Sequence, residues 1–363
     1  MKICYIGDAP NIHVQRWVKY FARRGNEIHL ITDRPAQIKG VTLHILKSKI
    51  KNRYLFFLLK LPEVRKIIKK IDPDVLHAHY IASYGVHAAI TNFHPLVITA
   101  LGSDVLLDPE NHKMLKPLIK FALKSADMIT CDGDNTKEAM IKLGANPQKI
   151  RIVYFGVDTE KFRPGKKDKG LLKNLSISNS QIVISLRYLK PVYNVETLIK
   201  SVPLILKHAP NAKFMIAGKG SEENSLKKLA KSLGILNSIR FVGRIPNDRL
   251  PQYLASSDIY VSTSLSDSGL SASTAEAMAC ELPVVITDTG DNRRWIEDGE
   301  NGFIVPVKDP ESLAEKIIYL LENEEVRTRF GKISRKIIDE RLNYRVEMEK
   351  MAKLYEELVK GYS

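Results

Sequence analysis

The sequence predicts an α/β fold of two Rossmann-like units, each with a doubly wound parallel sheet, that face each other across a cleft. The 363 residues exceed what one hydrophobic core usually serves. Strand-like apolar runs alternate with segments of helical apolar spacing along the whole chain, which is typical of parallel sheets with crossover helices. A polar stretch at residues 163–170 interrupts this alternation, so we expect two domains.

The first domain is expected to span residues 1–165 and to contain seven strands. Each expected strand is a short apolar run that ends at or near a turn-forming residue. Segments with helical spacing, such as 13–24, 83–92 and 135–143, lie between these runs. The expected strands are 2–8, 27–33, 41–46, 74–80, 96–102, 128–133 and 150–156.

The second domain is expected to span residues 172–342. The stretch 163–170 combines Pro, Gly and three lysines, which is a linker composition, and it places the boundary near residues 163–172. The last segment, 343–363, has helical apolar spacing and is expected to form a helix that returns to the N-terminal domain. The expected strands of this domain are 181–189, 212–218, 239–243, 259–264, 283–288 and 302–307.

Composition excludes several classes of protein. Hydrophobic residues make up 44% of the chain and charged residues 27%, which supports a core in each domain and excludes disorder as the main state. Cys4, Cys131 and Cys280 are too scattered for a disulfide framework or a zinc site and fit a reducing compartment. The apolar start at 1–8 ends in Gly-Asp, unlike a signal peptide, and the run 54–59 is too short to span a bilayer. We therefore expect a cytoplasmic protein.

The basic charge is concentrated in the first half. Residues 1–163 carry 26 Lys/Arg and 15 Asp/Glu, a net charge of +11 out of the +15 of the chain. Residues 47–70 carry nine of these cations around an apolar patch at 54–59, and Glu63 is their only acid. One hypothesis is that this segment binds anionic lipid and holds the protein peripherally on the inner face of a membrane. The alternative is a solvated helix whose apolar side packs in the core. No recognised nucleic-acid motif accompanies the charge, so no nucleic-acid partner is expected.

Candidate binding residues should follow strands, because loop amides and helix N-termini converge at the carboxyl edge of an open parallel sheet. In the second half, three of the four clusters that follow strands are cationic or rich in glycine, which indicates an anion pocket. Arg and Lys hold a diphosphate through charge-assisted hydrogen bonds, so a nucleotide is the expected ligand. The clusters are Arg187 with Lys190, Gly218-Lys219-Gly220, Gly243-Arg244, and Asp267-Ser268-Gly269-Leu270-Ser271.

Glu276 follows the last of these clusters, among the small and apolar residues of 274–280. A carboxylate in such surroundings usually has a partner, and the hydroxyls of a ribose would serve. The alternative is a charge on a helix surface.

A family resemblance rests on two segments. Residues 276–285 read Glu-Ala-Met-Ala-Cys-Glu-Leu-Pro-Val-Val, and residues 298–306 read Asp-Gly-Glu-Asn-Gly-Phe-Ile-Val-Pro. They resemble the carboxy-terminal half of glycosyltransferase family 4, the large retaining group with the GT-B fold. The resemblance extends to 241–243, 217–220 and 156–164, and it covers nearly the whole chain.

The resemblance implies transfer of a sugar from a UDP-sugar or GDP-sugar, with retention at the anomeric carbon and with neither a metal nor another cofactor. It implies that the second domain binds the donor and that Glu276 binds its ribose. It also implies that Gly243 and Arg244 lie near the base, that the amides of Gly269, Leu270 and Ser271 lie near the diphosphate or sugar, and that Arg187 binds phosphate.

The sequence departs from the family pattern at two positions on the donor side. Eight residues before Glu276, where the family carries glutamate, stands Ser268, with Asp267 beside it. The family's lysine falls on Val192, within a Pro-x-Tyr-Asn variant of the segment, and Lys190 is the expected substitute for its charge.

The first domain is expected to bind the acceptor. Asp104, in Gly-Ser-Asp, follows a strand where many relatives carry Thr-x-His-Gly; its carboxylate is a candidate for orienting or deprotonating the acceptor hydroxyl, and the alternative is a helix cap. His13 follows the first strand, in the loop that meets donor phosphate and acceptor in relatives. It is a candidate catalytic residue, with a neighbour of the helix cap as the alternative.

These observations predict a retaining glycosyltransferase that moves a sugar to a glycan or lipid-linked acceptor. Two rival interpretations stay open. One is a nucleotide-sugar epimerase on the same fold. The other is a non-catalytic subunit that binds nucleotide sugars, suggested by Ser268 and Leu101 at positions where relatives carry other residues.

Overall fold

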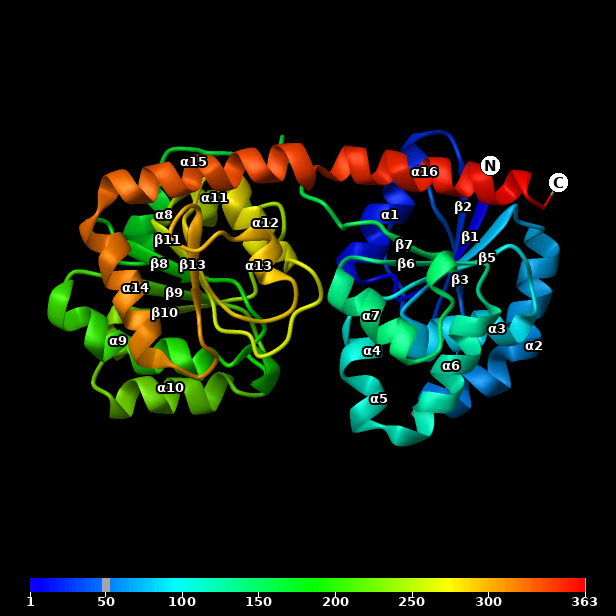
Figure 1. Ribbon diagram of the computed structural model, residues 1–363, viewed down its shortest axis with the longest axis horizontal. Coiled ribbons are helices and arrows are strands. Elements are labelled where there is room, and N and C mark those ends of the chain that lie inside the picture. Colours follow the sequence, from blue (N-terminus) through cyan, green and yellow to red (C-terminus); the bar gives the residue numbers. More distant parts are fainter. Residues whose placement is uncertain (48–52, 363) are drawn as a thin grey trace. The chain divides into compact units, whose positions relative to one another are not determined.

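The computed structural model describes residues 1–47 and 53–362, which form two compact units (Figure 1). The first unit comprises Met1–Phe155 with Arg345–Ser363, and the second comprises Gly156–Tyr344. Each unit is a parallel sheet flanked by helices. The predicted fold class, two doubly wound α/β units, is therefore confirmed.

The sheet of the first unit has seven strands in the order β3-β2-β1-β4-β5-β6-β7, and every neighbouring pair is parallel. The chain reverses its direction of winding between β1 and β4, where Tyr5 pairs with His77. Such a switch point opens a crevice at the carboxyl ends of the strands. The strands are β1 Lys2–Ile6, β2 Glu27–Thr32, β3 Thr42–Ile45, β4 Val75–His79, β5 Leu96–Thr99, β6 Met128–Cys131 and β7 Ile150–Ile152.

The helices of the first unit pack an apolar side against this sheet. In α1 the spacing of Val14, Trp17, Val18 and Phe21 places all four in the core, and the side chain of Asn11 caps the helix by accepting the amide of His13 at 2.8 Å. The helices are α1 Ile12–Arg23, α2 Arg53–Ile71, α3 Val86–Thr91, α4 Ser103–Leu106, α5 Asp108–Asn111, α6 Lys116–Ser125, α7 Asp134–Lys142 and α16 Tyr344–Lys360.

The C-terminal helix α16 lies beside α1 in the first unit (Figure 1). Met348, Met351 and Tyr355 of this helix are fully buried. The ring of Tyr355 packs against Phe21 of α1, with 5.1 Å between the ring centres. The end of the chain is thus part of the core of the first unit.

The sheet of the second unit has six parallel strands in the order β10-β9-β8-β11-β12-β13, with its switch point between β8 and β11. All thirteen predicted strands of the two units exist, and most end a few residues earlier than predicted because the last residues of each apolar run form the loop at the carboxyl edge. The strands are β8 Ile182–Ser185, β9 Lys213–Ala217, β10 Ile239–Gly243, β11 Ile259–Ser262, β12 Val284–Thr287 and β13 Gly302–Val305.

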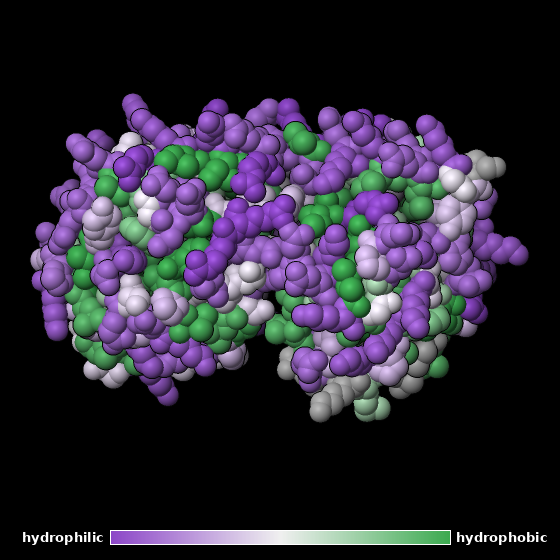
Figure 2. Space-filling model, in the orientation of Figure 1, coloured by the Kyte–Doolittle hydropathy of each residue, from purple (hydrophilic) through white to green (hydrophobic). Residues whose placement is uncertain are grey.

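Helices α9 and α14 of the second unit pack closely on each other, and their apolar residues share one core with β8, β9 and β11. The visible face of each unit is largely hydrophilic, with small apolar patches (Figure 2). The helices are α8 Lys169–Asn174, α9 Val195–His208, α10 Glu223–Ser232, α11 Leu250–Ala255, α12 Ala272–Ala279, α13 Asn292–Trp295, α14 Pro310–Glu322 and α15 Glu324–Arg341.

Within the described ranges, no helix has both the length and the apolar character needed to cross a membrane. The basic segment 47–70 that was considered as a lipid surface is described only in part. Residues 48–52 lie outside the described residues, and residues 53–70 belong to α2. In the described part, Leu59 is exposed while Val64 and Ile68 are buried, so one side of α2 packs in the core.

Candidate active site

Arg187 follows β8 and lies buried at the carboxyl edge of the six-stranded sheet, with 8% of its surface exposed. Its guanidinium group donates to the hydroxyls of Ser264, after β11, and Ser273, on α12, both at 3.3 Å. It also forms an ion pair with Asp267, in the loop between β11 and α12. The structure thus brings Arg187 together with Asp267 although 80 residues separate them.

Two glycines explain why the backbone near Arg187 takes this path. A Cβ atom on Gly218 would lie 2.1 Å from the carbonyl oxygen of Arg187, and one on Gly220 would lie 2.0 Å from that of Leu189. The amide of Leu189 donates to the carbonyl of Lys219 at 3.1 Å. The glycines after β9 therefore let two loops touch backbone to backbone, which holds Arg187 in place.

Tyr193 completes the surroundings of Arg187, and the sequence analysis did not single it out. The Arg187 guanidinium carbon lies 4.5 Å from the centre of the Tyr193 ring, a cation–π arrangement. The hydroxyl of Thr263, after β11, holds the turn by donating to the carbonyl of Tyr193 at 3.1 Å. The signal in the sequence was the Pro-x-Tyr-Asn variant that replaces the family's lysine.

Helix α12 carries the second polar group of this edge, Glu276, which is 9% exposed. Ser271 caps the helix by accepting the amide of Thr274 at 3.3 Å. Gly269, in the preceding loop, has a φ of +54°, a conformation that favours glycine. Ser273 of the same helix touches Arg187, so one short helix links Arg187, expected to bind phosphate, to Glu276, expected to bind the ribose.

The remaining predicted donor residues lie at the same edge of the sheet but are not all in contact. Gly243, with a φ of +68°, accepts the amide of Gly218 at 2.8 Å, which ties the loop after β10 to the glycine loop after β9. Leu270 is buried, and Ser268 is half-buried. The side chains of Lys190 and Arg244 are exposed, so Lys190 does not stand beside Arg187 in the buried cluster.

In the first unit Asp104 is fully buried at the start of α4. Its carboxylate accepts the backbone amides of Ile81 at 2.7 Å and Leu101 at 3.0 Å. Burial raises the pKa of Asp104 to about 7, against the lowering effect of these amides. Asp104 thus holds the loop after β4 to the loop after β5.

The loop that Asp104 holds presents Tyr80, which the sequence analysis did not select. Tyr80 follows β4 and has a φ of +84°, a rare conformation for a side-chain-bearing residue, and it precedes a π-helical turn at Ile81–Gly85. Its hydroxyl donates to Asp108 at 2.6 Å. Burial and this hydrogen bond raise the pKa of Tyr80.

His13 lies in the first turn of α1, and its ring packs on Phe155 with 4.3 Å between the ring centres. Burial, together with the charge of Arg16, lowers the pKa of His13 to about 4. The imidazole is therefore neutral at pH 7, and its Nδ1 atom has no hydrogen-bond partner among the described residues.

Two sequence profiles of known families match the chain, one in each unit. The family described as Glycosyl transferases group 1 matches residues 168–337. The family described as Glycosyl transferase 4-like matches residues 2–133. The chain is a glycosyltransferase of the family 4 type.

Curated relatives of this glycosyltransferase transfer sugars. The N-acetyl-alpha-D-glucosaminyl L-malate synthase of Bacillus anthracis is 27% identical over 361 residues, which cover 93% of this chain and 90% of that protein. A GDP-mannose-dependent alpha-(1-6)-phosphatidylinositol monomannoside mannosyltransferase of Mycobacterium tuberculosis is 23% identical over 266 residues, 69% of each chain.

Solved structures share the fold of the glycosyltransferase over both units. HepE of Anabaena, solved in complex with UDP-glucose, aligns with a TM-score of 0.86 and 19% identity over 99% of this chain and 100% of its own. Sucrose-phosphate synthase of Thermosynechococcus elongatus aligns with a TM-score of 0.87 and 18% identity, with the same coverage. These likenesses confirm the GT-B fold.

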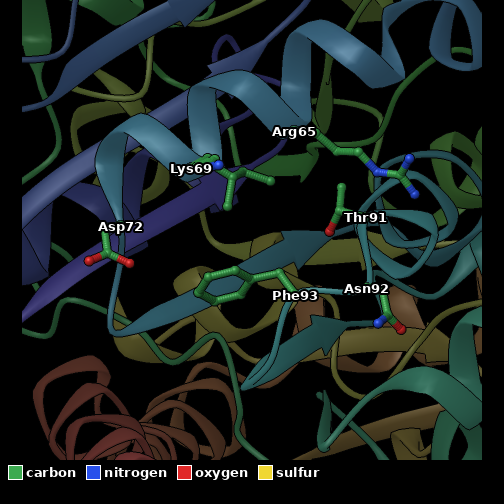
Figure 3. Close-up of a pocket in the computed structure, with 7 residues that line it drawn as sticks. Arg65, Lys69, Asp72, Thr91, Asn92 and Phe93 are labelled. Atoms are coloured by element: carbon green, nitrogen blue, oxygen red, sulfur yellow. The ribbon is translucent and has the colours of Figure 1, made fainter.

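The glycosyltransferase also has a cavity of about 380 Å³ at the opposite edge of the first sheet, between α2 and the segment that follows α3 (Figure 3). Arg65, Lys69, Asp72 and Asn92 line it, with Phe93 on one side. The residues that line the cavity come just before the first residues of β4 and β5. The cavity therefore lies at the amino ends of these strands, away from the carboxyl ends, where Tyr80 and Asp104 lie. Across the described ranges no cluster of His, Cys, Asp and Glu side chains is suited to hold a metal ion.

Proposed function

We propose that this glycosyltransferase moves a sugar from a UDP-sugar or GDP-sugar to a glycan or lipid-linked acceptor, with retention of configuration. The observation that carries the proposal is the buried guanidinium of Arg187 at the carboxyl edge of the second sheet, next to the helix that bears Glu276. HepE was solved with UDP-glucose, and a relative from Mycobacterium tuberculosis uses GDP-mannose, which supports both donor classes.

The chemistry requires help mainly at the leaving group. The bond between the anomeric carbon and the phosphate oxygen breaks, and the acceptor oxygen bonds to that carbon. The nucleoside diphosphate leaves with the electron pair, and one of its phosphate oxygens takes the proton of the acceptor hydroxyl. Arg187 is placed to stabilise the negative charge that develops on the phosphate, because a cation in a site shielded from water acts strongly. Glu276 is assigned to the hydroxyls of the ribose.

The acceptor is assigned to the first unit, where Tyr80 and Asp108 form a hydroxyl–carboxylate pair at the carboxyl edge of the sheet. Asp104, which accepts backbone amides of this loop, acts in this proposal as a positioning residue and not as the base for the acceptor hydroxyl. His13, neutral at pH 7, can accept a hydrogen bond from an acceptor hydroxyl.

A donor screen tests the proposal. A bound nucleotide raises the melting temperature by mass action, so a panel of UDP- and GDP-sugars should give one clear stabilising donor. The variants Arg187→Ala and Glu276→Ala should each lower the affinity for that donor by about 30-fold or more, which corresponds to roughly 2 kcal/mol of binding free energy. The controls Arg293→Ala and Glu300→Ala remove exposed charges of the same kind and should change little.

Product analysis then decides the reaction. A radiolabelled donor incubated with glycan and lipid-linked acceptors should give a glycoside whose anomeric proton shows the donor's configuration by NMR. An epimerised nucleotide sugar formed without an acceptor would support the epimerase interpretation. Donor binding without any product would support a binding subunit.

A further inference from the structure

Arg187 already has a counter-ion inside the protein. The side chains of Arg187 and Asp267 are 7% and 8% exposed, and they form an ion pair. The same guanidinium lies over the ring of Tyr193 and touches the hydroxyls of Ser264 and Ser273. Its charge is therefore balanced before any donor arrives.

A diphosphate that approached this pair intact would meet the carboxylate of Asp267 together with the cation. Like charges at close range in a buried site repel strongly, since little water screens them. Arg187 keeps its charge, because burial lowers its pKa but the negative charge of Asp267 more than offsets this and the net pKa is raised. Separation of the carboxylate from Arg187 would remove this repulsion when the phosphate binds.

The position of Asp267 in the chain permits this movement. It lies in the loop between β11 and α12, two residues before Gly269, which has a φ of +54°. Its neighbour Ser268 stands where family members carry glutamate. The partners that hold Arg187 from other directions, Ser273 on α12 and the ring of Tyr193, do not depend on this loop segment.

We propose that Asp267 is the internal counter-ion of Arg187 and that the donor's diphosphate displaces it. Asp267 is then a positioning residue: it holds Arg187 until the donor binds and competes with the phosphate for it. This inference rests on the proposed function, because it requires Arg187 to bind the diphosphate. It assigns Asp267 a role different from contact with the donor sugar.

The variant Asp267→Asn tests the competition, because it keeps the shape and removes the charge. Inorganic diphosphate and UDP or GDP, titrated by calorimetry, should bind this variant about tenfold more tightly than the wild type, and the ligand-free variant should melt at a lower temperature. Asp288→Asn is the matched control, because it makes the same change of charge in an exposed pair with Arg293 of the same unit. It should change the affinity by less than about twofold.

Equal or weaker diphosphate binding by Asp267→Asn would overturn the inference. Should the amide variant not fold, Asp267→Ser is measured in its place, with the same expected tightening. The double variant Arg187→Ala/Asp267→Asn should bind diphosphate no more tightly than Arg187→Ala alone, because the tighter binding depends on Arg187. If Arg187→Ala weakens nucleotide binding but neither Asp267 variant strengthens it, only this inference fails. If the wild type binds no nucleotide, the proposed function fails as well.

Discussion

The imidazole of His77 on β4 hydrogen-bonds the hydroxyl of Tyr355 on α16, although 278 residues separate the two in the chain. The same hydroxyl lies 3.1 Å from that of Tyr5 on β1, and the other imidazole nitrogen lies 2.6 Å from the hydroxyl of Thr99 on β5. This fully buried network fastens the C-terminal helix to three adjacent strands of the first unit.

Removal of the Tyr355 hydroxyl should destabilise the first unit. Tyr355→Phe takes away the hydroxyl that bonds the buried Nδ1 of His77, together with its hydrogen bond to Tyr5, which should lower the free energy of unfolding by about 1–3 kcal/mol. Urea unfolding followed by the fluorescence of Trp17, in a Trp295→Phe background, reports on this unit. Tyr319→Phe removes an exposed hydroxyl in the second unit and is the control. An unchanged midpoint in Tyr355→Phe would show that the network contributes nothing.

A side chain at Gly220 should disturb the donor site. In Gly220→Ala the new Cβ would meet the carbonyl of Leu189 at 2.0 Å, so the loop that holds Arg187 must shift. We expect a loss of about 1–3 kcal/mol in the stability of the second unit and weaker nucleotide binding. Gly234→Ala is the control that separates a steric clash from backbone strain, because Gly234 has a φ of +71° but a Cβ atom there would have no neighbour within 4 Å. It should cost stability through backbone strain and leave nucleotide affinity intact.

The ring of Tyr193, and not its hydroxyl, should support Arg187. Tyr193→Ala removes the face over which the guanidinium lies and should weaken nucleotide binding by about tenfold, the factor for roughly 1.4 kcal/mol. Tyr193→Phe keeps the ring and should bind nearly as well as the wild type. An equal loss in both variants, measured by calorimetry, would assign the effect to the hydroxyl.

The buried carboxyl of Asp104 should make the first unit less stable as the pH rises. The pKa of Asp104 is raised to about 7 in the folded protein, against about 4 in an unfolded chain. The folded state therefore holds more protons between these values, and the free energy of unfolding falls as the pH rises from about 4 to about 7. Asp104→Asn should remove this contribution. The Trp17 reporter, measured from pH 5 to pH 8, should give a flatter profile for the variant than for the wild type.

The basic segment 47–70 yields a prediction about membranes. Sedimentation with vesicles that contain anionic lipid should decrease with added salt if Lys66 and Lys69, both exposed on α2, contribute to binding. The double variant Lys66→Glu/Lys69→Glu should sediment less than the wild type, while the double variant Lys207→Glu/Lys228→Glu, made at exposed lysines of the second unit, should not. Equal sedimentation of all proteins, with or without salt, would contradict the lipid hypothesis.

Much of this protein could be predicted from the order of its residues. Apolar runs bounded by turn residues located every strand, because such runs are short and local. The motifs around Glu276 and Gly302 identified the family, since they are contiguous in the chain. Helix α16 was predicted from its apolar spacing alone.

Only the tertiary structure decided what the selected residues touch. Arg187 meets Asp267, Gly220 meets Leu189, and Asp104 caps the loop that holds Tyr80 in a left-handed conformation. Sequence patterns could not reveal these pairs, because each joins two loops that come together only when parallel strands align their carboxyl ends. The residue types therefore determined which chemistry the chain carries, and the packing of backbone against backbone at the sheet edges decided which charges face each other.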